Sequence, residues 1–252
     1  MRVEKLIIQN EKWADIPLLH IYDEGFNNET PIVIFLHGFM SGKEHNLHYA
    51  YNLVKQGVRV IMPDALYHGE REEGQIEAQL FWPIVLQNIA EVGVIYDTLI
   101  SKGYIGNVAL AGTSMGGITT AGCLYKYDWI KAAAILMGAV SFPKLFNFQI
   151  KNLEELGVPV HAMEDQIASL KLAIAKYDAF QQSEPFEKVP LFFWHGQNDP
   201  TVPVEMSYTF WNMQKERGKD QNIIYKLDQN AGHAVTREGV LQTVNFLVQH
   251  LA

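Results

Sequence analysis

The sequence contains a single cysteine, Cys123, among its 252 residues. One cysteine excludes an intramolecular disulfide, which agrees with a reducing compartment. Long apolar runs are also missing, since no stretch approaches the about 18 consecutive apolar residues that a membrane-spanning helix needs. The first ten residues lack the continuous apolar core of a signal peptide. We therefore expect a cytoplasmic protein without a membrane partner.

Positive charge is scarce as well, with 20 Lys and Arg residues against 28 Asp and Glu residues and a net charge of −8. Binding to nucleic acid or to an anionic membrane would need a clustered positive face. The composition therefore disfavours a nucleic-acid partner. We interpret the acidity as a contribution to solubility rather than as an indication of the substrate. Repeats and low-complexity tracts are missing too, and 48% hydrophobic residues suffice for one large core. We expect a single domain over residues 1–252.

Short apolar runs alternate with helix-like stretches along most of the chain. Strands are expected at 2–9, 17–23, 31–37, 58–62, 107–112, 131–137, 189–195 and 222–228. Helices are expected at 46–56, within 76–101, and at 115–126, 203–217 and 236–250. The first two strands would form a hairpin. The alternation after them favours an α/β fold with a mostly parallel sheet of about eight strands, helices on both faces, and functional loops at the carboxyl ends of the strands.

Residues 141–187 interrupt this alternation between two expected core strands. The segment is rich in Phe and contains helix-like stretches at about 151–156 and 162–180. Its insertion point favours a small helical cap over the site proposed below. The alternative is a set of ordinary core helices with surface decoration.

The pentapeptide Gly112-Thr113-Ser114-Met115-Gly116 lies where a buried-strand run gives way to a helix of small and apolar residues. A serine held at such a sharp strand-to-helix turn needs small residues two positions before and after it, because the helix passes close to the strand. The pattern predicts that Ser114 is a catalytic nucleophile. The alternative is a turn serine in a glycine-rich connection.

Two further elements appear in the order that this nucleophile needs. Asp199 follows the strand expected at 189–195, and His233 precedes the last helix. The order Ser, Asp, His is that of α/β-hydrolases and differs from the orders of chymotrypsin-like and subtilisin-like chains. The rivals of Asp199 are Asn198, whose neutral amide could not stabilise an imidazolium, and Asp228, which is expected at the end of a strand. Asp199 could also serve only as a helix cap.

A strand ending in His37-Gly38-Phe39 supplies a candidate oxyanion hole. We expect the backbone N–H of Phe39 to face the nucleophile, with the N–H of Met115 at the helix start as the second donor. His37 and His195 end strands and are expected to shape loops by hydrogen bonding. His45 and His48 could suggest a metal pair, but no third ligand at convincing spacing accompanies them, so we expect no metal and no cofactor.

With these motifs the chain resembles the serine esterases of the α/β-hydrolase superfamily, more closely the branch of prolyl-oligopeptidase-like and dienelactone-hydrolase-like proteins. The resemblance runs from about residue 15 to the C-terminus and is weakest over 141–187. The matching residues are His37-Gly38-Phe39, the run 63–71, Gly112 to Gly117, the run 195–199 with Val202-Pro203, and Gly232-His233. Dienelactone hydrolases use a cysteine nucleophile, whereas Ser114 stands in that place here.

The resemblance implies the α/β-hydrolase fold and an activity like that of small bacterial carboxylesterases, which hydrolyse short acyl esters. The expected partner is therefore a small-molecule ester, and the oligomeric state stays open. A thioesterase or a small peptidase would use the same residues. Outside enzymes, a receptor that binds a small ester or lactone in a retained pocket is the alternative.

Overall fold

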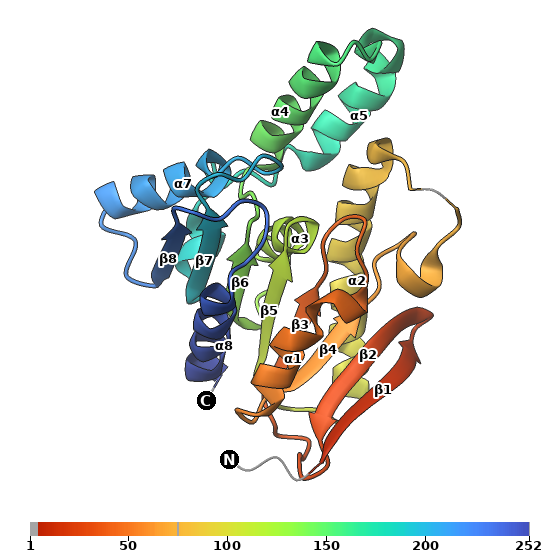
Figure 1. Ribbon diagram of the computed structural model, residues 1–252, viewed down its shortest axis with the longest axis vertical. Coiled ribbons are helices and arrows are strands. Elements are labelled where there is room, and N and C mark those ends of the chain that lie inside the picture. Colours follow the sequence, from red (N-terminus) through yellow and green to blue (C-terminus); the bar gives the residue numbers. More distant parts are fainter. Residues whose placement is uncertain (1–4, 75, 252) are drawn as a thin grey trace.

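The structure, a computed structural model that describes residues 5–74 and 76–251, centres on one eight-stranded sheet (Figure 1). The strand order is β1-β2-β4-β3-β5-β6-β7-β8. β1 and β2 form an antiparallel hairpin and β2 runs antiparallel to β4, whereas the remaining neighbours are parallel. The strands are β1 (Leu6–Trp13), β2 (Ile16–Asp23), β3 (Ile32–Leu36), β4 (Arg59–Pro63), β5 (Val108–Thr113), β6 (Ile130–Leu136), β7 (Leu191–Gly196) and β8 (Ile223–Asp228).

Helices cover both faces of the sheet, because the central strands carry apolar side chains on both faces. In β3, Ile32 and Ile34 pack into the core on the α2 and α3 side, whereas Val33 and Phe35 pack into the core beneath α1 and α8. Because successive side chains alternate between the faces, a strand buried on both sides is apolar throughout. The helices are α1 (Leu47–Val54), α2 (Phe81–Ser101), α3 (Met115–Cys123), α4 (Phe142–Glu155), α5 (Glu164–Ile174), α6 (Glu184–Glu187), α7 (Glu205–Glu216) and α8 (Arg237–Leu251).

The helix within Ala78–Ser101 is the one span, among the described residues, that is long and apolar enough to cross a membrane. In this fold it is a core helix. α2 and the short 3₁₀ helix before it, η3 (Ala78–Leu80), make up this span, and α2 packs against α3. Ile84, Val85 and Ile89 of α2 are buried in the main core, which accounts for its apolar composition.

The first strand of the opening hairpin lies further along the chain than predicted. β1 runs from Leu6 to Trp13 rather than over 2–9, and residues 2–4 of that prediction lie outside the described residues. The turn is formed by Ala14 and Asp15, with φ of 47° and 67°, so Trp13 pairs directly with Ile16. Two successive residues with positive φ are typical of a tight hairpin turn, usually made by Asn and Gly. The pair Ala14-Asp15 lacks this turn signature, so the predicted first strand ended before the observed turn.

Within residues 141–187, α4 and α5 form a helical hairpin that projects beyond the carboxyl ends of the strands (Figure 1), and α6 packs back onto the body with Phe186 buried. The helix expected at 151–156 starts at Phe142, since the Ser141 side chain accepts a hydrogen bond from the Lys144 N–H and Pro143 occupies the first turn. The helix expected over 162–180 ends at Ile174. There the chain returns to the body, where Ser141 pairs with Asp178 and the Phe142 N–H donates to the Tyr177 carbonyl.

Candidate functional site

Ser114 lies in a strained turn between β5 and α3. Its backbone has φ of 53° and ψ of −117°, a region that residues with a Cβ rarely adopt. A Cβ on Gly112 would overlap the backbone of Gly116, and a Cβ on Gly116 would overlap the carbonyl oxygen of Leu36 in β3. The two glycines therefore let α3 cross directly over β5 and β3, and the serine is held at the tip of the turn.

The three predicted side chains meet at this tip. His233 Nε2 lies 2.8 Å from Ser114 Oγ, and His233 Nδ1 lies 2.7 Å from Asp199 Oδ2. Both distances are those of short, direct hydrogen bonds. Asp199 lies in the loop after β7 and His233 in the loop between β8 and α8, so residues 119 and 34 positions apart are joined in one chain of hydrogen bonds. This arrangement can withdraw a proton from the serine hydroxyl.

Asp199 is fixed by its other contacts. Its Oδ1 accepts from the backbone N–H groups of Thr201 and Val202, each at 2.9 Å, and its side chain is fully buried. Burial alone would raise the pKa of this carboxyl group. Hydrogen bonds from His195, His233 and the two N–H groups outweigh burial and hold the pKa of Asp199 well below its ordinary value. The group is therefore an anion at neutral pH, as an orienting partner of His233 must be.

The predicted oxyanion donors flank the serine. Among the described residues, the N–H groups of Phe39 and Met115 have no hydrogen-bond acceptor in the protein. A Cβ built on Gly38, the residue before Phe39, would lie 3.4 Å from the Ser114 Cβ, so the loop after β3 passes beside Ser114. Met115 is the first residue of α3, where the helix dipole favours negative charge. A developing oxyanion would find both donors available.

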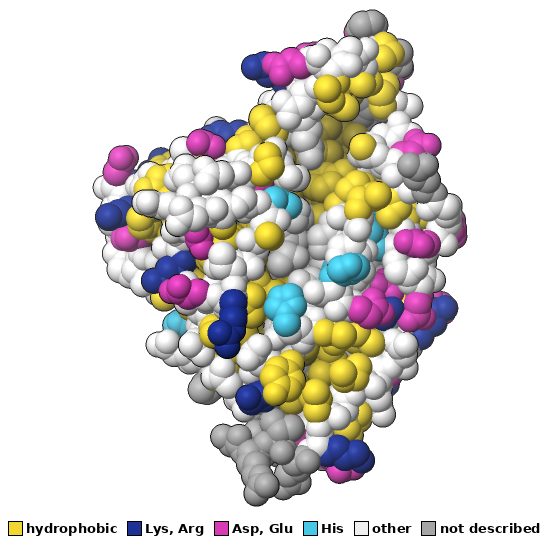
Figure 2. Space-filling view, viewed as in Figure 1, with side chains coloured by type: hydrophobic (Ala, Val, Ile, Leu, Met, Phe, Trp, Pro, Cys, Tyr) yellow, Lys and Arg dark blue, Asp and Glu magenta, His cyan; other side chains and the backbone are white. Residues whose placement is uncertain are grey.

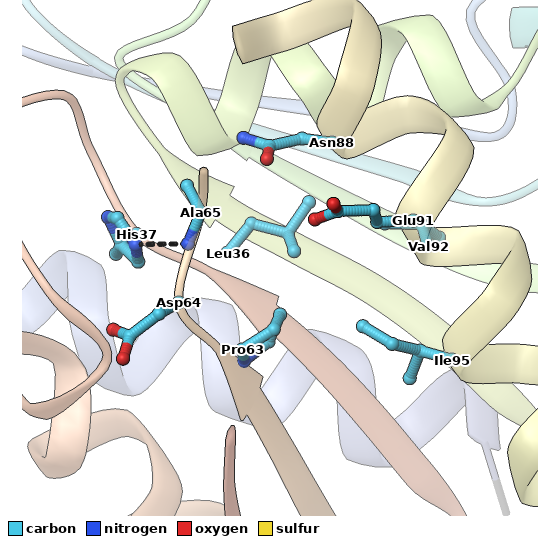
Figure 3. Close-up of a pocket in the computed structure, with 9 residues that line it drawn as sticks. All are labelled: Leu36, His37, Pro63, Asp64, Ala65, Asn88, Glu91, Val92 and Ile95. Carbon is cyan, nitrogen blue, oxygen red and sulfur yellow. Dashed lines mark hydrogen bonds between the residues drawn. The ribbon is translucent and has the colours of Figure 1, made fainter. Parts of the chain in front are cut away.

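Two histidines hold this loop against the loop after β4. The Nδ1–H of His37 donates to the Gly38 carbonyl at 2.8 Å, and its Nε2 accepts from the Ala65 N–H at 3.0 Å (Figure 3). His68 Nε2 accepts from the Met40 N–H at 3.1 Å. Burial lowers the pKa of His37 to about 4 and also lowers that of His68. Both rings are neutral at pH 7, which their acceptor roles require. The sequence indicated the loop-shaping role of His37, and the family resemblance placed His68 in a structural turn near Asp64.

A buried ion pair, which the sequence did not indicate, supports the same loops. Lys43 Nζ lies 2.6 Å from Asp64 Oδ2 and 2.8 Å from Glu70 Oε1, and the side chains of Lys43 and Asp64 are only 1% and 0% exposed. Burial by itself lowers the pKa of Lys43, but the hydrogen bonds to Asp64 and Glu70 raise it above its ordinary value. Asp64 also lines a small cavity of about 10 Å³ together with His37, Asn88 and Glu91. Figure 3 shows the residues that line it.

The rival residues occupy supporting places. Asp228 Oδ1 accepts from the N–H groups of Asn230 and Ala231, so it shapes the turn that leads to His233. The Asn198 side chain donates to the Gln229 carbonyl and joins the two loops that carry Asp199 and His233. Neither contacts the His233 ring among the hydrogen bonds of the described residues.

His195 also supports the site, as the sequence suggested for a loop-shaping histidine. Its Nε2 lies 2.9 Å from the Val202 carbonyl and 3.4 Å from Asp199 Oδ2, and its Nδ1 lies 3.1 Å from Ser207 Oγ. The carbonyl must accept, so Nε2 donates to Val202. His195 thereby holds the loop after β7 in place next to Asp199.

Comparison with known proteins shows the family of this chain. The prolyl oligopeptidase family matches residues 88–252. The Bacillus subtilis (strain 168) protein named "Putative esterase YitV" is 40% identical over 252 residues, which cover 97% of this chain and 99% of that protein. The chain belongs to the prolyl oligopeptidase family. "Esterase YjfP" of Escherichia coli (strain K12) is 31% identical over 251 residues, covering 97% of this chain and 99% of that protein.

Among solved structures, the crystal structure of TT1662 from Thermus thermophilus has the same fold, with a TM-score of 0.76 at 18% identity and coverage of 98% of both chains. As a member of the prolyl oligopeptidase family, the chain is a serine hydrolase with the α/β-hydrolase fold. The expected resemblance to this branch is confirmed, and so is the expected fold, with its mostly parallel sheet covered on both faces.

Proposed function

We propose that this chain is a carboxylesterase that hydrolyses short-chain acyl esters through Ser114, His233 and Asp199. The observation that carries the proposal is the unbroken hydrogen-bond chain from the serine hydroxyl through the imidazole to a buried carboxylate. Two relatives that match nearly the whole chain bear the name esterase, which supports an ester rather than an amide as the substrate. The preference for a short acyl group rests on the resemblance to small bacterial carboxylesterases.

The proposed reaction has two acyl-transfer steps. His233 Nε2 takes the proton of Ser114 Oγ while the oxygen attacks the ester carbonyl carbon, and the N–H groups of Phe39 and Met115 bind the oxyanion. The C–O bond to the alcohol breaks as His233 returns the proton to the leaving oxygen. Water then attacks the acyl-serine by the same route and releases the acid. Asp199 keeps the Nδ1 proton of His233 in place and stabilises the imidazolium, so the reaction needs no cofactor.

Replacement of the nucleophile tests the proposal. We expect Ser114→Ala to lower kcat for p-nitrophenyl acetate and butyrate by about 10⁶, because the covalent route is lost and only binding and the oxyanion hole remain. Ser101→Ala, at the exposed end of α2, should leave kcat unchanged. Steady-state kinetics on both variants give the comparison. Ester turnover that survives in Ser114→Ala would show that another group is the nucleophile.

The same purified protein separates the alternatives on this site. A thioesterase would hydrolyse an acyl thioester faster than the matching oxygen ester, and a peptidase would hydrolyse an aminoacyl anilide. Receptor behaviour would appear as tight binding with very slow turnover on every ester. Many turnovers per second on p-nitrophenyl acetate, with much slower cleavage of the other two classes, are expected for the carboxylesterase.

A further inference from the structure

A large cleft lies between the start of α2, with η3, and the hairpin of α4 and α5. Its volume is about 940 Å³. Figure 2 shows the hollow beneath the projecting hairpin, with hydrophobic side chains along its walls. Across the back of the cleft, the Trp82 Nε1–H donates to Gln149 Oε1 at 2.8 Å, which ties α2 to α4. The walls of the cleft thus come from two separate parts of the chain, which this hydrogen bond joins.

The chemistry of the lining is apolar and lacks positive charge. Leu80, Phe81, Phe146, Ile150, Ile167 and Leu170 contribute to the walls. The charged side chains among the described lining residues are Glu77 and Asp165, both acidic, and neither Lys nor Arg occurs among them. An apolar group would gain by leaving water for this surface. A phosphate or carboxylate would meet negative charge and no cation to pair with.

Two aromatic rings in contact link the wall of the cleft to the loop beside Ser114. Gly38 lies against Ser114, and Phe39 follows it in the chain. The Phe39 ring meets the Phe81 ring edge to face, with centroids 5.5 Å apart, and Phe81 lines the cleft. In a substrate whose carbonyl oxygen is bound at the Phe39 N–H, the ester group would therefore be separated by the Phe39 ring from Phe81, a residue that lines the cleft.

We propose that this cleft binds an uncharged apolar part of the ester substrate while the ester carbonyl lies at Ser114. The inference rests on the proposed esterase function and extends it to a substrate class: neutral esters with a long or bulky apolar group. About 940 Å³ is at the upper end of the range for small-molecule sites, and far more than an acetyl or butyryl group fills. Combined with a short acyl group, this assigns the apolar part to the alcohol.

Two ester series test the inference and distinguish the two sides of the ester. In the alcohol series, ethyl, butyl and octyl acetate are compared by proton release at concentrations below their solubility limits. In the acyl series, p-nitrophenyl acetate, butyrate and octanoate are compared. Each methylene that enters an apolar site can raise kcat/KM by up to about fourfold. We expect at least a tenfold rise from ethyl to octyl acetate.

A matched anionic substrate tests the charge of the cleft. The acetate ester of 8-hydroxyoctanoate has the chain length of octyl acetate but ends in a carboxylate. We expect it to lose most of the gain that octyl acetate shows over ethyl acetate, because the carboxylate would leave water for apolar walls whose charged lining residues, Glu77 and Asp165, are both acidic. Equal kcat/KM for the two octyl esters would overturn the preference for uncharged groups.

A pair of variants on α5 locates the effect. Leu170 lines the cleft and is partly buried, whereas Leu172, two residues on, is 82% exposed and lies outside the lining. We expect Leu170→Glu to lower kcat/KM for octyl acetate at least tenfold and to leave ethyl acetate nearly unchanged. Leu172→Glu should change neither. Ethyl acetate turnover also reports that each variant is folded, and Leu170→Ala, with a smaller expected loss, serves if the glutamate variant does not fold.

The outcomes separate the two proposals. A rise along the alcohol series that Leu170→Glu removes supports the cleft as the alcohol site. A rise along the acyl series, removed in the same way, supports the cleft but overturns the short-acyl preference. Equal kcat/KM across both series, or a rise that Leu170→Glu leaves intact, overturns the inference alone. No Ser114-dependent hydrolysis of any ester overturns the proposed function and the inference with it.

Discussion

At the scale of single residues, the site depends on how completely Asp199 is bound. One carboxylate oxygen accepts two backbone N–H groups and the other faces His233, so the group has no freedom to rotate away. His195 packs beside it and is itself held by Ser207, whose hydroxyl lies 2.8 Å from the Tyr225 hydroxyl. The position of the His233 ring is therefore determined by a network that begins in β8 and α7.

Asp199→Asn tests the orienting role. The asparagine keeps the shape of the side chain, but its amide N–H would face His233 Nδ1 and favour the wrong imidazole tautomer. We expect kcat for p-nitrophenyl acetate to fall by about 10⁴ with a much smaller change in KM. Asp228→Asn is the matched control, because its oxygen can still accept from Asn230 and Ala231. Similar kinetics for the two variants would contradict the assignment of Asp199.

At the scale of elements, the candidate oxyanion loop is held by its neighbour. The loops after β3 and β4 are joined by His37 to Ala65, by Met40 to His68 and by Lys43 to Asp64. Asp64 also accepts from the N–H groups of Lys43 and Glu70. The Phe39 N–H thus belongs to a double loop whose two halves stabilise each other, and not to an isolated turn.

Lys43→Met tests this double loop. Removal of the cation leaves the Asp64 carboxylate buried without its ionic partner, which typically lowers the free energy of unfolding by about 3–5 kcal/mol. Lys5→Met removes a cation from an exposed pair with Glu24, where both side chains are more than half exposed, and should cost about 1 kcal/mol or less. Urea unfolding of both variants measures the difference. A loss below about 1 kcal/mol in Lys43→Met would contradict a structural role for the pair.

At the scale of the whole molecule, the candidate catalytic residues all lie at one edge of the sheet. The candidate nucleophile Ser114 follows β5, the candidate oxyanion loop follows β3, Asp199 follows β7, and His233 lies in the loop after β8. These four strands run parallel, so all four carboxyl ends reach the same edge. The hairpin of α4 and α5 rises from this edge as well (Figure 1).

The stability of the whole molecule should depend on pH through His37. Burial lowers its pKa to about 4 in the folded protein, against 6.5 for an ordinary histidine. Between these values the unfolded chain binds a proton that the folded protein does not, so stability is fully present above about pH 6.5 and is lost as the pH falls toward 4. From pH 7.5 to pH 5 this single group should cost about 2 kcal/mol.

His37→Asn isolates that contribution, because asparagine does not titrate and the other histidines remain in both proteins. We expect the free energy of unfolding in urea to fall by about 2 kcal/mol less in His37→Asn than in the unchanged protein between pH 7.5 and pH 5. Identical pH slopes for the two proteins would mean that His37 titrates at its ordinary value in the fold.

Local sequence signals identified most of the strands and helices and the order Ser114, Asp199, His233. The predicted bounds of an element were wrong where the local sequence pattern was weak or where contacts with distant residues determined the end of the element. The Ala14-Asp15 turn lacks the usual residues of a tight hairpin, so the first strand was placed too early. The helix expected at 151–156 begins earlier, at Phe142, because Phe142 and Phe146 form part of its buried face.

The sequence by itself determined the two-sided burial of the central strands, the strained turn at Ser114 and the residue types able to withdraw its proton. These features follow from local rules: alternation along a strand, small residues where backbones cross, and side-chain chemistry. Only the tertiary structure decided that Lys43 and Asp64 form a buried pair and that Phe81, in the wall of the cleft under α4 and α5, contacts the ring of Phe39. Such contacts join residues far apart in the chain, so no local pattern encodes them.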